Sequence, residues 1–148
     1  MSNKTLFLIA AFAVICSAPA SAQFAPLIFD PQQALNSDEF KTALGDDVSF
    51  YFVGVAPSSV KEQIGEIVLH RATVRRFGSR EDTCRRVLLT LLRDFQGRAK
   101  DIGANAVINL QSVDIKDPAG DPTMIECLSG NQVQGRITLK GTFAQIEK

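Results

Sequence analysis

Apolar residues recur at intervals of three and four between residues 84 and 102, which is the period of one helix face. The stripe consists of Cys84, Leu88, Leu91, Leu92, Phe95, Ala99 and Ile102. Ser79 can cap the first turn, with Asp82 in the place of the usual capping-box Glu or Gln. Gly103 suits the left-handed residue that ends a helix. The pattern predicts one main amphipathic helix from about Ser79 to Ile102, with its stripe facing a core.

A period of two predicts strands. Residues 133–143 are apolar or glycine at odd positions and polar at even ones, so one face of this strand should be buried and the other wet. Strands are also expected over residues 66–74 and 123–128. Ala106, Ile108 and Leu110 should share one face, and a change of parity after them predicts a bulge near Gln111 or Ser112.

Residues 49–55 are apolar on both faces, which favours a central strand covered on both sides. Asp30 and Pro31 can begin a short helix, and Asn36 or Ser37 can begin another that ends near Gly45. Residues 23–33 should be loosely held. The expected fold class is therefore α+β, with an antiparallel sheet of about five strands and the main helix packed on one face.

The N-terminus has the form of a secretory signal peptide. Lys4 precedes an apolar run over residues 6–15, and Ala20-Ser21-Ala22 provides a cleavage site between Ala22 and Gln23. A retained membrane anchor would need about 20 apolar residues. A lipoprotein signal would need a small residue where Ile15 precedes Cys16. Both alternatives fit less well, so we expect a periplasmic or secreted protein without a stable membrane anchor.

Three segments follow from this interpretation: residues 1–22 as signal peptide, 23–45 as an N-terminal segment with short helices, and 46–148 as a single α+β domain. The chain has 148 residues, with 16 basic and 16 acidic ones. Removal of Lys4 leaves a net charge near minus one. The protein as a whole has no electrostatic reason to bind nucleic acid.

Cys84 and Cys127 are the two cysteines that remain after cleavage. An even number in an exported protein indicates a disulfide, which would tie the start of the main helix to the sheet. A redox pair or a thiolate metal site is the alternative. The close Cys-x-x-Cys spacing of a redox pair is absent, and a zinc site would need two more ligands.

Six arginines gather within sixteen residues: Arg71, Arg75, Arg76, Arg80, Arg85 and Arg86. They can form a solvated rim that pairs with nearby Glu and Asp residues. Alternatively, they form a binding site for an envelope protein or an anionic glycan, lipid headgroup or acidic surface.

No motif predicts catalysis or a cofactor. His70 is the sole histidine, on the strand face of Val68 and Ala72, and we expect a partly buried packing residue there rather than a catalyst. A hydrolase using His70 or a carboxylate pair is the alternative. A phosphate-binding loop and a Gly-x-Ser-x-Gly motif are absent, and we expect no metal site.

Several motifs resemble those of a group of small exported bacterial proteins that often carry the label of excinuclease ABC homologues. They are Phe50-Tyr51-Phe52-Val53-Gly54, Gly65-Glu66, Cys84-Arg85-Arg86, Gln96-Gly97-Arg98-Ala99, Gly103-Ala104-Asn105-Ala106-Val107-Ile108-Asn109, Glu126-Cys127, Ser129-Gly130 and Gly141. The helix followed by Gly-Ala-Asn-Ala-Val is also similar to the YbjQ-type fold and to the RcsF-like envelope lipoproteins.

The excinuclease label implies a nucleotide-driven DNA repair protein, which the missing phosphate loop, missing zinc cysteines, short length and signal peptide contradict. The YbjQ likeness implies heavy-metal binding, for which the few cysteines and histidines give little support. The RcsF likeness implies envelope stress sensing or partner binding, although this chain lacks a lipobox and has fewer mature cysteines. We therefore expect a non-enzymatic binding or envelope-associated module.

Overall fold

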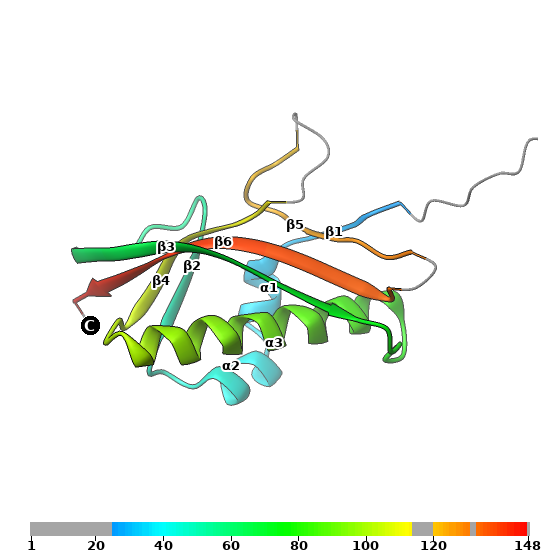
Figure 1. Ribbon diagram of the computed structural model, residues 1–148, viewed down its shortest axis with the longest axis horizontal. Coiled ribbons are helices and arrows are strands. Elements are labelled where there is room, and N and C mark those ends of the chain that lie inside the picture. The colour runs from blue at the N-terminus through cyan, green and yellow to red at the C-terminus, as the bar shows by residue number, and fades with distance from the viewer. Residues whose placement is uncertain (1–24, 114–119, 131–132, 148) are drawn as a thin grey trace, which may run out of the picture.

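The computed structural model describes residues 25–113, 120–130 and 133–147 (Figure 1). Its elements are β1 (Leu27–Phe29), α1 (Pro31–Leu35), α2 (Asp38–Leu44), β2 (Ser49–Phe52), β3 (Val60–Thr73), α3 (Arg80–Asp101), β4 (Ala106–Ser112), β5 (Ile125–Cys127) and β6 (Gly135–Ile146). One sheet has the strand order β2-β4-β6-β3, and β1 pairs with β5 in a second sheet. The expected α+β class is confirmed. The expected signal peptide and its cleavage site between Ala22 and Gln23 lie outside the described residues.

Local signals in the sequence determine where α3 begins and ends. The Ser79 hydroxyl accepts from the Asp82 N–H at 3.0 Å, and the Asp82 carboxylate accepts from the Ser79 N–H at 3.0 Å, which completes a capping box. Gly103 has a φ of 75°. The predicted helix is confirmed, except that Ile102 lies after its end and is 47% exposed instead of facing the core.

The main core lies between α3 and one face of the four-stranded sheet (Figure 1). Phe95 of α3 meets Phe143 of β6 with ring centroids 6.2 Å apart. The other face of the sheet carries a smaller cluster of Ala106, Ile108, Ala144 and Ile146 with Tyr51 packed against it. Alternation on β6 holds from Gly135 to Gly141, and beyond this point residues on both faces are buried.

The position of β2 differs from the prediction. It is an edge strand and pairs in parallel with β4, so the sheet is mixed and β2 is not central. Phe50 and Phe52 pack on the main core while Tyr51 packs on the smaller cluster. Strand β2 is thus covered on both faces although it lies at the edge of the sheet, because the main core covers one face and the smaller cluster covers the other.

The predicted bulge exists but lies closer to the start of β4. The pairing with β6 shifts between Ile108 and Gln111, and Asn109 has a φ of 54°. The extra residue turns Leu110 toward the main core, whereas Ala106 and Ile108 face the smaller cluster. The expectation that these three residues share a face is therefore wrong.

The N-terminal segment is more ordered than predicted. Helices α1 and α2 are confirmed, with Asp30 capping α1, Ser37 at the start of α2 and Gly45 at its end. However, β1 lies within residues 23–33 and pairs antiparallel with β5. A three-residue strand gains its order from that partner, which the local sequence does not reveal.

A disulfide joins Cys84 to Cys127, with 6.0 Å between their Cα atoms. Both residues are fully buried. Cys84 lies in the first turns of α3 and Cys127 in β5, so the bridge ties α3 to the β1–β5 pair rather than to the four-stranded sheet.

Candidate functional site

The connection from β3 into α3 carries most of the clustered arginines. We call residues 73–86 the β3–α3 corner. Its backbone is held by Thr73, whose hydroxyl accepts from the Arg75 N–H at 3.1 Å, and by Thr83, whose hydroxyl accepts from the Phe77 N–H at 2.9 Å. Because Thr83 is fully buried, Phe77 is anchored to the body of the protein.

Phe77 is the centre of the corner. The guanidinium carbon of Arg75 lies 5.6 Å from the ring centroid, and that of Arg86 lies 5.1 Å from it. Both distances are within the range of cation–π attraction. Phe77 is not among the candidate residues that the sequence pattern indicates. An aromatic residue next to two arginines was the signal that could have revealed this site.

Few carboxylates neutralise these two guanidiniums. Arg75 and Arg86 are exposed, and within the described parts of the chain neither makes an ion pair. Arg76 donates from Nε to the Gly78 carbonyl at 3.1 Å, which leaves its terminal nitrogens available. Each guanidinium has five N–H donors, so the corner presents many donors to solvent.

Asp82, an acidic residue within the corner, is already engaged in capping α3. The backbone N–H and the hydroxyl of Ser79 donate to Asp82 and lower the pKa of that carboxyl, to which the charges of Arg85 and Arg86 also contribute. Asp82 therefore stays ionised and holds the helix start.

A hollow of about 340 Å³ opens beside Phe77. It is lined by Glu39, Phe77, Gly78, Asp82, Arg85 and Arg86. Arg85 is tied to α2, because it donates to the Ser37 hydroxyl at 3.3 Å, pairs with Glu39 at 3.8 Å and lies 5.8 Å from the Phe40 ring. Its role is to pack α2 against α3.

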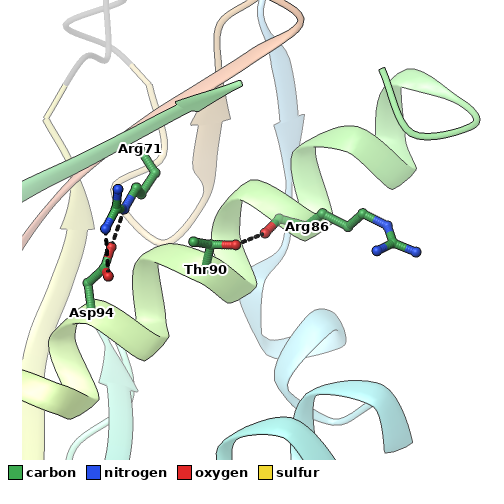
Figure 2. Close-up of polar contacts among 4 residues, drawn as sticks. All are labelled: Arg71, Arg86, Thr90 and Asp94. Carbon is green, nitrogen blue, oxygen red and sulfur yellow. Dashed lines mark hydrogen bonds and ion pairs between the residues drawn. The ribbon is translucent and has the colours of Figure 1, made fainter. Parts of the chain in front are cut away.

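Arg71 points away from the corner. Its guanidinium donates through Nε and Nη2 to both carboxylate oxygens of Asp94, the Nη2 distance being 2.8 Å, while the Arg86 side chain extends in another direction (Figure 2). The hydrogen bond to Asp94 and then its charge raise the pKa of Arg71. Arg71 thus joins β3 to α3.

Arg80 lies on the side of the corner that faces the N-terminal segment. It donates to the Ala25 carbonyl, and together with Arg76 it lines a second hollow of about 140 Å³. The six predicted arginines therefore do not form one surface. Arg75, Arg76 and Arg86 remain available at the corner, while the other three connect elements.

His70 is exposed on β3, so the expectation of a partly buried packing residue is wrong. It lines a hollow of about 540 Å³ that also contains Asp94 and Asp101. Arg71 occupies both oxygens of Asp94, and no Ser, Thr or Cys lines the hollow. The lining residues thus offer a histidine and carboxylates without a hydroxyl or thiol nucleophile.

No group of three or more His, Cys, Asp or Glu side chains gathers into a metal site within residues 25–113, 120–130 and 133–147. In the same ranges, no helix combines the length and apolarity needed to cross a bilayer. No protein-family model, no curated protein and no solved structure matches the chain.

Proposed function

We propose that this protein is an exported, disulfide-stapled, non-enzymatic binding domain whose β3–α3 corner binds a carboxylate-bearing partner in the envelope, either an acidic protein surface or an anionic glycan. The N-terminal pattern and the buried Cys84–Cys127 bridge support export, because such bridges persist in oxidising compartments.

The observation that carries the proposal is the pair of exposed arginines on one anchored ring. Contact with Phe77 restricts Arg75 and Arg86 while leaving their N–H groups accessible. Guanidinium groups bind carboxylates through two parallel hydrogen bonds, and a restricted side chain loses less conformational entropy on binding. Two such groups on one ring suit a partner that displays closely spaced carboxylates.

The experiment measures binding of the purified protein to fluorescently labelled poly-L-glutamate by anisotropy at several salt concentrations. We expect binding that weakens as salt rises, because exposed charges are screened over about 10 Å at 0.1 M salt. The double variant Arg75→Glu/Arg86→Glu should lower affinity by about tenfold or more, since two attractive contacts become repulsive.

Lys41→Glu is the matched control, because Lys41 is an exposed cation on α2 and its change reverses a charge outside the corner. This variant should retain the affinity of the unmodified protein. Equal loss of affinity in both variants, or no loss in the double variant, would contradict the proposal.

A further inference from the structure

Strand β3 has an open backbone edge. It spans 14 residues at the end of the order β2-β4-β6-β3, and in the described part of the chain no strand pairs with its outer side (Figure 1). Such an edge offers a row of N–H and C=O groups to another strand. Irregularities in its pairing with β6 end at Gly65, so β3 is regular from Gly65 to Thr73.

The regular part of β3 is complementary to itself, and we infer that two copies of this chain pair antiparallel through β3 about a two-fold axis at Val68. Val68, which is 49% exposed, then lies opposite Val68 of the second copy. On the same face, Glu66 lies opposite His70. On the α3 face, Ile67 lies opposite Leu69, and both already pack against the main core. The apolar side chains of Ile67 and Leu69 from the two copies would thus meet at the axis.

The next residue pair also fits this register. Gly65 lies opposite Arg71 of the second copy, and a glycine leaves room beside an arginine that Asp94 holds in place. A register centred on Leu69 would instead set Ile67 against Arg71. That shift would set an apolar side chain against a charged one on the α3 face, so the Val68 register is favoured.

The helix layer is compatible with the same axis. Each α3 packs under both β3 and β6 of its own copy. If the two copies of β3 pair at the usual strand spacing of about 4.8 Å, the two copies of α3 run antiparallel about 10 Å apart, which is near the usual spacing of packed helices. Arg93 and Arg98 are exposed on α3 and lie in the hollow beside β3, as does Asp101. These charged side chains would therefore lie along the seam between the two copies.

A second copy is favoured over an unrelated strand as the partner of β3. A single two-fold rotation sets apolar residues opposite apolar ones, Glu66 opposite His70, and Gly65 opposite Arg71. The β3–α3 corner lies beyond the paired stretch, at the far end of β3. The dimer would therefore carry two corners at opposite ends.

Sedimentation velocity of the purified protein over a wide concentration range tests the dimer. We expect a species of twice the chain mass, and Val68→Glu should weaken dimerisation by about tenfold or more, because it places two like charges directly opposite each other. Val113→Glu is the control, since Val113 is 48% exposed outside β3 and should leave the dimer intact. Circular dichroism checks that each variant folds.

Val68→Cys tests the register without adding charge. Directly opposed residues of an antiparallel pair have Cα atoms about 4.5–5.5 Å apart, which is within disulfide range. Mild oxidation should give a covalent dimer on non-reducing gels, whereas Val113→Cys should not. A purified protein that stays monomeric at all concentrations, or a Val68→Cys variant that gives no covalent dimer, would overturn the inference.

Discussion

Gly141 is the position where a single added methyl group would disturb the core most directly. A Cβ there would lie 2.8 Å from a Leu110 methyl group, 2.9 Å from a Val107 methyl group and 3.3 Å from the Phe95 ring. All three neighbours are fully buried, so none can move into solvent. We predict that Gly141→Ala lowers the free energy of unfolding by about 1–3 kcal/mol, as overpacking does, measured by urea denaturation.

Gly97→Ala provides the matched control. Gly97 lies inside α3, and nothing approaches within 4 Å of an added Cβ. Alanine favours the helix by about 1 kcal/mol relative to glycine, so this variant should be more stable than the unmodified protein. If Gly141→Ala stabilised the protein as much as Gly97→Ala does, the close packing described around Gly141 would be contradicted.

The capping box at Ser79 and Asp82 predicts a dependence of stability on pH. The hydrogen bonds from Ser79 lower the folded-state pKa of Asp82 below its unfolded value, so its contribution to stability is present above the unfolded-state pKa and is lost as pH falls through the folded value. Asp121, whose pKa is lowered by the Thr123 hydroxyl and N–H, acts in the same direction. The urea midpoint should therefore fall as the pH drops below about 4.

Asp82→Asn isolates the capping box from the other carboxylates. This variant should have a lower urea midpoint than the unmodified protein at neutral pH. Its midpoint should also fall less between pH 5 and pH values below about 4, because the amide does not titrate. Asp121 is intact in both proteins and provides a common background. Identical pH profiles would contradict the assigned role of Asp82.

At the scale of elements, the disulfide has the largest single effect that we predict. It joins Cys84 to Cys127, which are 43 positions apart in the sequence, and for a loop of this size the chain-entropy model gives about 4 kcal/mol. The double variant Cys84→Ala/Cys127→Ala should lose up to this amount in urea denaturation. Reductant should destabilise the unmodified protein but not the double variant.

Elements whose signals are local could be predicted from the sequence. The cap at Ser79 and Asp82, the buried stripe and Gly103 all lie within α3 or next to it. The edge position of β2 could not be predicted, because it depends on pairing with β4 more than fifty residues away. For the same reason, a three-residue strand such as β1 gives no recognisable pattern alone.

The candidate site was predictable in composition but not in arrangement. The spacing of the arginines indicated a cluster, yet Arg71 is paired with Asp94, which lies 23 residues further along the chain. Whether a guanidinium is engaged or available depends on which element packs against it. The partnership of Arg75 and Arg86 with Phe77 likewise forms only when β3 and α3 meet.

At the scale of the molecule, the disulfide and the corner both depend on the start of α3. Cys84 anchors that start from the buried side, while Arg86, two residues later, reaches the Phe77 ring. The bridge therefore supports the geometry of the proposed binding corner. We predict that reduction weakens poly-L-glutamate binding under conditions where most of the protein remains folded, as checked by circular dichroism.

The central claim, an exported domain stapled by one bridge, is tested most directly by mass spectrometry of the protein isolated from the cell envelope or medium, without reduction. We predict a mature chain that begins at Gln23 and a proteolytic fragment in which Cys84 and Cys127 are linked. A protein that retains Met1 in the cytoplasmic fraction, with free thiols at both positions, would contradict the account.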